Sequence, residues 1–464
     1  MKIRRWLLAT LICLTGWMGW EARAQETPDL LPGEKYQQWW NAELQQEIDA
    51  RIEKYRKADA EVTLRDVKPG TEVSVEQVSH AFLFGAHIFN FDQLGSEECN
   101  ARYKKLYGTI FNSATIAFYW KAFEPEPGKP RYQASEEDSP EFWNQLSEPW
   151  KQPHWRRPAP EKIIEFCQSK GIAMHGHPII WGNMKWNHPT WISKEPEKVA
   201  EMKRLFEKRV VEIARYYKDV IPSWDVVNES VDPVPGKPRY GTIPEDYTFQ
   251  AFQQAEKEFP ASVQLNINDS WRAVYPPFIQ DLIQRGAKID VIGLQMHIFG
   301  SQPMLKIMDG QDILTNGTSW HPRNVEKYLE ELDQFQRPLH LSEITIPAPG
   351  EDERANALQA RLARDMYRLW FSWPSIYRIT WWNVVDDCGA SGEPLKSGLF
   401  TRQMEPKPVF HALDQLINEE WKTRFTQKAE NSEVTLKFRG FKGKYRITWT
   451  NSAGEKKVQE IKVL

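Results

Sequence analysis

Cysteine is scarce in this chain and follows no regular spacing. Only 4 of the 464 residues are cysteine, and Cys99, Cys167 and Cys388 are the ones that lie beyond the amino-terminal segment. An odd and scattered set does not suit a disulfide framework, and it lacks the paired spacing of a zinc site. The sequence therefore predicts a fold stabilised by its hydrophobic core, without a structural metal.

The sequence also lacks the motifs of several protein classes. It has no glycine-rich phosphate loop and no serine elbow, and His175 and His177 have no acidic third ligand beside them. With 60 basic and 63 acidic side chains the chain is mildly acidic, a composition that does not favour nucleic-acid binding. We therefore expect no metal, no cofactor and no nucleic-acid partner.

No apolar run is long enough to cross a membrane. Residues 1–24, "MKIRRWLLATLICLTGWMGWEARA", have the basic start, short apolar stretch and Ala-Arg-Ala ending of a secretory signal peptide cut after Ala24. The apolar stretch from Trp6 to Trp20 is short for a span, and glycines interrupt it. We expect an exported protein, extracellular or periplasmic, without a membrane span after cleavage.

The remaining sequence alternates short apolar runs with amphipathic stretches. Residues 197–220 and 353–373 are examples of the stretches with helical period. Strand and helix alternating eight times predict an α/β fold, the (β/α)₈ or TIM barrel. The eight predicted strands span residues 82–89, 112–120, 172–181, 223–229, 263–269, 291–298, 338–346 and 377–385.

The two ends of the chain have a different pattern. A charged helix is predicted over residues 41–58, and residues 60–81 alternate apolar and polar around a Lys-Pro-Gly turn, as in a β-hairpin. The last residues alternate again, with glycine turns, and predict a small β module. The predicted regions are a signal peptide (1–24), a helix and β-hairpin region (25–78), the barrel (79–420) and a carboxy-terminal β module (421–464).

Two glutamates occupy the positions where a barrel enzyme carries its chemistry. Glu229 ends the fourth predicted strand and Glu343 lies near the end of the seventh. The carboxyl ends of the strands form the open face of such a barrel. Glycoside cleavage needs one acid to protonate the leaving oxygen and a second carboxylate to attack the anomeric carbon or activate water.

The motifs around both glutamates resemble a known family. "WDVVNE" at 224–229 and "LSEITI" at 341–346 are similar to the acid/base and nucleophile signatures of glycoside hydrolase family ten, best known for endo-β-1,4-xylanases; the resemblance covers residues 79–420. It implies a retaining double displacement with Glu229 as acid/base and Glu343 as nucleophile, while Asn228 hydrogen-bonds the sugar 2-hydroxyl.

The resemblance assigns further residues to the sugar site. It places His177 and Trp181 at the wall of the subsite for the attacked sugar, with Asn268 and Gln295 from the next strands. It also implies that His297 orients Glu343 and that Trp382 forms the floor. The family has an unusual cis peptide after the histidine that matches His177, so we expect a cis bond between His177 and Pro178.

Departures from the family pattern concern the substrate. The second strand of the family brings polar groups that hold sugars on the non-reducing side of the cut, whereas this chain reads "TIAFYWKAFEPEPG" at 115–128, with Lys121 as a candidate replacement for the missing lysine. Gly182 and Thr345 also replace family residues, and a tryptophan is missing after the eighth strand. A standard xylan grip is therefore not expected.

A long insertion at residues 133–160 contains three tryptophans and is a candidate lid or sugar platform; a loop whose rings pack onto the barrel is the alternative.

Three functions remain open for the chain. They are cleavage of xylan or a related decorated polysaccharide, the same mechanism on another β-glycan, and carbohydrate binding without turnover. The sequence does not determine the oligomeric state.

Overall fold

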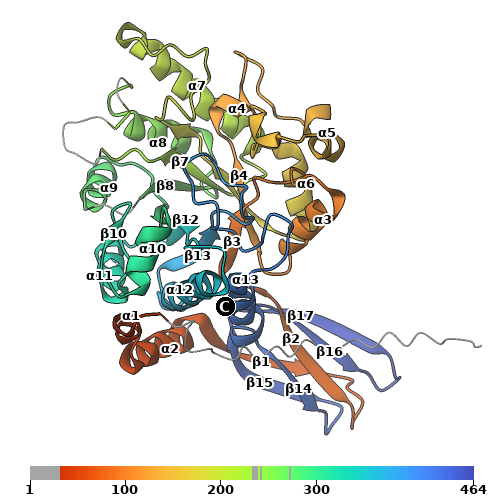
Figure 1. Ribbon diagram of the computed structural model, residues 1–464. Coiled ribbons are helices and arrows are strands. Elements are labelled where there is room, and N and C mark those ends of the chain that lie inside the picture. Colours follow the sequence, from red (N-terminus) through yellow and green to blue (C-terminus); the bar gives the residue numbers. More distant parts are fainter. Residues whose placement is uncertain (1–31, 233–238, 241–242, 271–272) are drawn as a thin grey trace, which may run out of the picture.

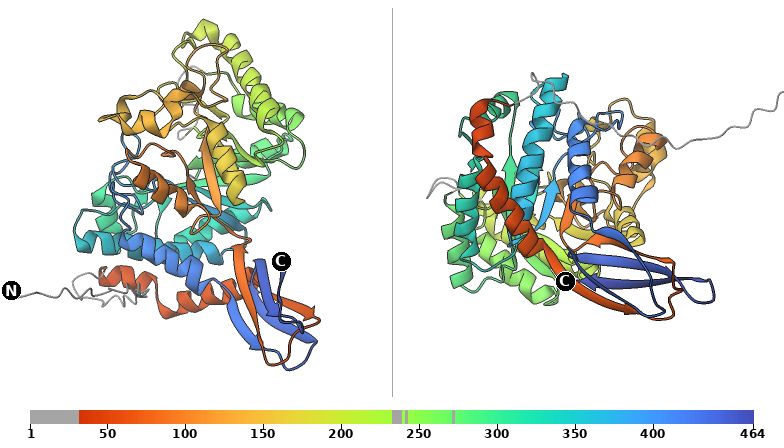
Figure 2. Two further views of the ribbon diagram at one scale, coloured as in Figure 1. Left: turned by 90° about the vertical axis from the view of Figure 1, so that its right-hand side faces the viewer. Right: turned by 90° about the horizontal axis from the view of Figure 1, so that it is seen from below.

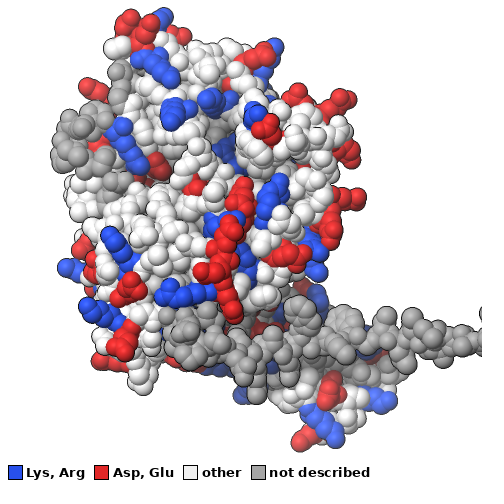
Figure 3. All heavy atoms as spheres, viewed as in Figure 1, with Lys and Arg blue, Asp and Glu red and all other residues white. Residues whose placement is uncertain are grey.

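The computed structural model describes residues 32–232, 239–240, 243–270 and 273–464 (Figure 1). The predicted signal peptide at residues 1–24 lies outside the described residues. In the described part of the chain no helix is both long enough and apolar enough to cross a bilayer. Acidic and basic side chains lie near one another on the face shown in Figure 3, and neither sign covers it continuously.

Eight parallel strands close into a barrel. Strand β13 pairs with β3, and Gly176 in β5 pairs with Trp224 in β7, which completes the ring. Most barrel strands are buried on both faces, because helices cover the outside and side chains fill the inside. The (β/α)₈ prediction is confirmed. In order, the barrel strands are β3 (Leu83–His87), β4 (Ser113–Ala117), β5 (Ala173–His177), β7 (Ser223–Asn228), β8 (Gln264–Ser270), β9 (Val291–His297), β12 (Leu339–Thr345) and β13 (Ile376–Trp381).

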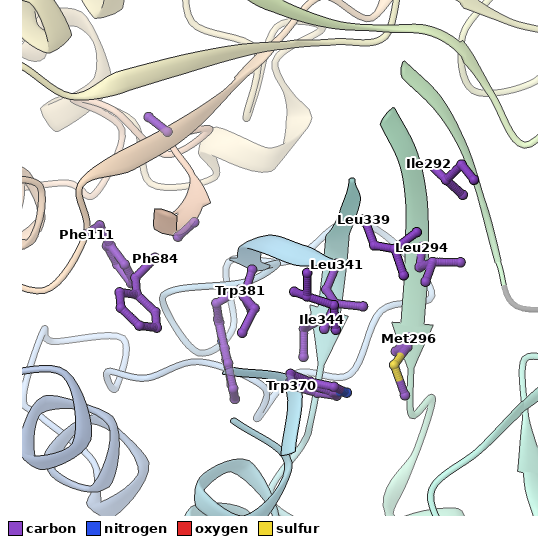
Figure 4. Packing of buried hydrophobic residues seen from close by; sticks show 14 of the residues in the cluster. Phe84, Phe111, Ile292, Leu294, Met296, Leu339, Leu341, Ile344, Trp370 and Trp381 are labelled. Carbon is purple, nitrogen blue, oxygen red and sulfur yellow. The ribbon is translucent and has the colours of Figure 1, made fainter. Parts of the chain in front are cut away.

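Helices surround this barrel and begin at recognisable signals. Ser96 caps α3 through a hydrogen bond from the backbone of Cys99, and Asp352 caps α12 in the same way. Figure 4 shows Leu341, Ile344 and Trp381 packed close to Trp370 of α12 in the core. The covering helices are α3 (Glu97–Leu106), α6 (Pro160–Lys170), α7 (Val199–Tyr217), α8 (Tyr247–Glu258), α9 (Tyr275–Gln284), α11 (Pro322–Asp333), α12 (Glu353–Ser372) and α13 (Pro408–Asp414), with short additional helices at α4 (Trp120–Phe123) and α10 (Ser301–Met308).

The two termini combine in one β unit that projects from the barrel (Figure 2). Helices α1 (Glu34–Trp39) and α2 (Ala42–Arg56) lead into it, and α2 lies beside α12. Strand β1 (Lys57–Leu64) pairs with β15 (Val434–Phe441). The second sheet has the order β14 (Arg424–Lys428), β2 (Glu72–His80), β16 (Gly443–Thr450) and β17 (Lys456–Val463).

The predicted amino-terminal hairpin is therefore wrong. β1 and β2 are strands, but they lie in different sheets and each pairs with carboxy-terminal strands. Alternating apolar residues identify a strand with one buried face, yet they do not select its partner. Val75, Leu436, Tyr445 and Ile447 share one small core, which joins the two ends of the chain.

The third barrel strand is interrupted just after His177. Strand β5 ends there, and the short β6 (Ile180–Trp181) resumes pairing with β7. The described residues contain no cis peptide bond, so the expected cis bond between His177 and Pro178 is wrong. Trans is the isomer that an X–Pro bond favours by about 0.5–1 kcal/mol when its surroundings do not select cis.

The insertion at residues 133–160 contains the short helix α5 (Pro140–Asn144), and its Trp155 packs against the main hydrophobic core. Trp143 is 1% exposed and packs against His154 and Trp155, whereas Trp150 is 59% exposed. The three rings are therefore not one exposed platform.

This difference in burial predicts different effects of substitution within the insertion. We expect Trp143→Ala to lower the free energy of unfolding by about 3–5 kcal/mol, because a large buried ring is removed. The matched change Trp150→Ala should cost less than about 0.5 kcal/mol. Urea denaturation of both variants measures this, and equal losses would contradict the packing described.

Candidate active site

The two predicted glutamates line one cavity of about 210 Å³ at the carboxyl ends of the strands. Glu229 directly follows β7, and Glu343 lies in β12. Of the other predicted site residues, His177 and Asn268 lie behind the wall and bond to wall residues. The remaining predicted residues line the cavity directly, together with groups that the sequence did not single out: Asn228, Trp181, Gln295, His297 and Trp382, then Tyr119, Arg239, Phe299, Asn316 and Glu393.

The Glu343 carboxylate is held by three side chains from strands β8 and β9. Its Oε1 accepts hydrogen bonds from Asn268 Nδ2 at 2.8 Å and Gln295 Nε2 at 2.9 Å. His297 Nε2 lies 3.4 Å from Oε2, and the other ring nitrogen of His297 lies 2.8 Å from Thr345 Oγ1. The carboxylate is therefore fixed in direction, with only 6% of the side chain exposed.

Asn228 is fixed by the same two donors. Its Oδ1 accepts hydrogen bonds from Asn268 Nδ2 at 2.8 Å and Gln295 Nε2 at 3.1 Å. These bonds occupy the amide oxygen, which defines the orientation of the Asn228 amide at the cavity wall. One pair of amides thus positions both Asn228 and Glu343.

Glu229 occupies an unusual backbone conformation with φ of 51°. Its backbone N–H donates to the carbonyl of Asn268 at 2.7 Å, which holds the turn at the end of β7. The carboxylate oxygen Oε2 accepts hydrogen bonds from Tyr240 Oη at 2.7 Å and Arg239 Nη2 at 2.9 Å. Both of these partners bind Oε2, and among the described residues Oε1 has no hydrogen-bond partner and is the oxygen available to a substrate.

Tyr240 and Arg239 connect Glu229 to its surroundings. The Tyr240 hydroxyl accepts a hydrogen bond from Trp181 Nε1 at 3.0 Å, and Arg239 Nη1 lies 3.2 Å from Asp269 Oδ1. Burial raises the pKa of Asp269 to about 6, against the opposing effect of Arg239. Sequence reasoning missed Arg239 and Tyr240 because they follow a stretch without helical or strand period.

His177 belongs to a buried chain of polar groups below the cavity. Its Nδ1 lies 2.8 Å from Asp225 Oδ2 and its Nε2 lies 3.1 Å from the Tyr119 hydroxyl. His175 Nε2 reaches the same Asp225 oxygen at 2.9 Å. Burial by itself raises the pKa of Asp225, but both histidines outweigh it and hold that pKa below its usual range. In the part of the chain that the structure describes, no group of three or more His, Cys, Asp or Glu is placed to hold a metal.

The side of the cavity near β4 is built from rings. Tyr119 follows β4, and its ring meets the edges of Phe89 and Trp181. Trp382 packs on Phe89 at the base of the same group. Lys121, the candidate replacement for a sugar-binding lysine, is exposed and does not line the cavity.

An arginine of the insertion reaches the floor of the cavity. Arg156, with φ of 59° and only 2% exposed, donates to Glu393 Oε2 at 3.2 Å and Asn383 Oδ1 at 2.9 Å. Glu393 in turn accepts a hydrogen bond from Trp382 Nε1 at 3.0 Å. The insertion therefore helps to position the predicted floor residue. The tryptophans of the insertion did not predict a role for Arg156. No sequence pattern predicted the contact between Arg156 and Glu393.

The Arg156 pair predicts a specific dependence of stability on pH. Burial raises the pKa of Glu393, but Arg156 and the hydrogen bonds outweigh it and lower that pKa to about 2. A depressed carboxyl pKa stabilises the fold above the ordinary value near 4.3, and this contribution is lost as the pH falls toward 2. Between pH 5 and 2.5 we expect the free energy of unfolding of the wild type to fall by about 2 kcal/mol more than that of Glu393→Gln.

Denaturant titrations at several pH values measure this difference, with Glu330→Gln as the matched control. Glu330 is exposed on α11 and should leave the pH dependence unchanged. Parallel pH curves for the wild type and Glu393→Gln would contradict the ion pair.

Comparison with known proteins identifies the family of this site. Residues 80–416 match the sequence model of Glycosyl hydrolase family 10. The chain belongs to glycosyl hydrolase family 10. It is therefore a glycoside hydrolase by family, and the two signature motifs of the sequence lie within the matched residues.

Relatives of this family 10 chain are distant. Endo-1,4-beta-xylanase B of Thermotoga neapolitana is 25% identical over 284 residues, which are 57% of this chain and 75% of the relative. The anti-sigma-I factor RsgI6 of Acetivibrio thermocellus is 25% identical over 412 residues, which are 87% of this chain and 46% of the relative. Among solved structures, xylanase 10B of Thermotoga maritima aligns with a TM-score of 0.54 and 21% identity, covering 73% of this chain and 96% of that one. That structural likeness supports the barrel fold of this family 10 member.

Proposed function

We propose that the chain is a retaining glycoside hydrolase that cuts β-1,4-linked xylan or a related decorated plant polysaccharide by double displacement. The observation that carries this proposal is the placement of Glu229 and Glu343 in the wall of one cavity, each with a different set of partners. Membership of family 10 and the xylanases among the relatives support the substrate class.

In the first step Glu343 acts as the nucleophile. Its oxygen bonds to the anomeric carbon while the bond from that carbon to the leaving oxygen breaks, and Glu229 supplies the proton to the leaving oxygen. Asn268 and Gln295 hold Oε1 of Glu343, and His297 lies beside Oε2, so the attacking group loses little freedom in the transition state. Asn228 donates its amide to the sugar 2-hydroxyl, a contact that strengthens as positive charge develops.

In the second step Glu229 acts as a base. It takes a proton from water, and the water oxygen bonds to the anomeric carbon as the bond to Glu343 breaks. Tyr240 and Arg239 hold Glu229 Oε2, which leaves Oε1 for both proton transfers. Trp181 and Trp382 serve as the wall and floor around the attacked sugar, and His177 supports the wall from behind through Tyr119.

We also propose that the protein is exported, since residues 1–24 have the pattern of a signal peptide. The ring-lined side near Tyr119 favours a substrate that differs from plain xylan, because rings replace hydrogen-bonding groups there. Another β-glycan cut by the same two glutamates is therefore the second candidate.

Product analysis on a panel of xylans, glucans and mannans tests the substrate class. We expect β-1,4-linked xylans to be cut, with decorated forms cut faster than plain xylan, and the Glu343→Gln variant serves as the blank. Cleavage of glucan or mannan alone supports the second candidate, and specific binding without any product from the wild type contradicts hydrolysis.

A further inference from the structure

Two consecutive arginines of the insertion take different directions. Arg156 turns inward to Glu393 and Asn383, while Arg157 lies over the face of Tyr119, with its guanidinium carbon 3.6 Å from the ring centroid. Arg156 itself has a positive φ of 59°, which is uncommon for a residue other than glycine. A hydrogen bond from Arg157 Nη1 to the Arg156 carbonyl, at 2.7 Å, fixes the second arginine in place.

The two charges are balanced differently. Arg156 has the Glu393 carboxylate, which also accepts hydrogen bonds from Trp382, Asn383 and the backbone of Ala390. Arg157 has neither an ion pair nor a side-chain hydrogen bond to an acid within the described ranges, and it is half-buried. Burial lowers the pKa of Arg157 to about 10, so it remains charged at neutral pH.

The position of Arg157 is next to the proposed sugar site. Tyr119 lines the cavity, and its hydroxyl bonds to His177, which lies 3.8 Å from Glu343. The segment at residues 115–128 lacks the polar sugar-binding groups that the family has there. Arg157 is therefore a charged hydrogen-bond donor at the edge of a wall lined by aromatic rings. A planar guanidinium with free donors matches the two oxygens of a carboxylate.

We propose that Arg157 on Tyr119 binds the carboxylate of an acidic sugar, a uronic acid carried by the polysaccharide. This inference rests on the proposed function, because it takes the cavity beside Tyr119 as the site for the sugars on the non-reducing side of the cut. The Tyr119 ring holds the guanidinium in position by stacking, and the Arg156 carbonyl fixes its rotation. The arriving carboxylate supplies the directly bonded acidic partner that Arg157 lacks among the described residues.

Calorimetric binding to the full chain carrying Glu343→Gln tests the proposal without turnover. The probes are a neutral β-1,4-linked xylose oligosaccharide and a series of acidic oligosaccharides of the same length. Each member of the series carries one glucuronic acid, at a different position. We expect one acidic isomer to bind about tenfold more tightly than the neutral probe. Arg157→Gln should reduce this preference to less than about twofold, while Arg157→Lys, which keeps the charge but not the planar fork, should retain part of it.

Arg102→Gln is the matched control, since Arg102 lies on α3 and pairs with Glu98 and Glu405. It should leave the preference unchanged, and 0.5 M NaCl should weaken the preference in the parent. An equal affinity of the parent for all probes, no binding of any probe, or a preference that Arg157→Gln does not change would overturn the proposal. Hydrolysis by the chain without Glu343→Gln is scored separately, so failure of the proposed function remains distinguishable.

Discussion

Replacing Glu343 by glutamine is expected to lower kcat by about 10⁴-fold or more on every substrate that the wild type cuts. An amide does not form the covalent intermediate at a useful rate, and the amides of Asn268 and Gln295, which hold Glu343 Oε1, are not nucleophiles that could replace the lost carboxylate. The loss should appear in kcat and kcat/KM together, because the missing bond forms only along the reaction path.

The fold should survive this change. Glutamine has the same shape, and its amide oxygen can accept the hydrogen bonds from Asn268 and Gln295. The melting temperature and steady-state kinetics of Glu343→Gln are to be compared with those of Glu330→Gln, an exposed glutamate of α11. Activity near the wild-type level in a folded Glu343→Gln variant would refute the nucleophile assignment.

Replacing Glu229 by alanine is expected to lower kcat on polysaccharide by about 10²–10⁴-fold. A sugar oxygen is a poor leaving group without a proton, and the variant has lost the carboxyl group that is proposed to deliver it. In an aryl glycoside with an acidic phenol, the phenolate leaves without needing a proton. The first step on such a substrate should therefore change much less.

The second step separates Glu229 from Glu343. Water needs a base to attack the covalent intermediate, whereas azide does not, and the alanine leaves space for a small anion beside Arg239 and Tyr240. We expect azide to accelerate turnover of an activated aryl glycoside by Glu229→Ala and to give a glycosyl azide of retained configuration. Mass spectrometry and NMR of the product measure this. A folded variant that azide does not accelerate would count against the acid/base role, with Glu330→Ala as the control for azide itself.

Some contacts of the site depend on residues that no local pattern connects. Arg239 and Tyr240 reach Glu229 from a segment without periodic signal, and Arg156 crosses to Glu393 over more than two hundred positions of the chain. The tryptophans of the insertion suggested a lid or sugar platform. In the structure Trp143 is buried, and the arginines of the insertion approach the cavity. Side-chain direction decides such roles, and it depends on the packing of the neighbours.

The sequence by itself determined the barrel and the position of its two glutamates. Strand and helix periods are local, eight repeats of them specify the fold class, and strand ends in a parallel barrel share one face, so Glu229 and Glu343 could be placed from the chain alone. The tertiary structure decided what local pattern does not encode. It joined the amino-terminal strands to the carboxy-terminal ones, left the bond before Pro178 trans, and directed Arg156 to Glu393 and Arg157 onto the ring of Tyr119. The reason is physical: pairing partners and side-chain directions depend on contacts between segments far apart in the chain.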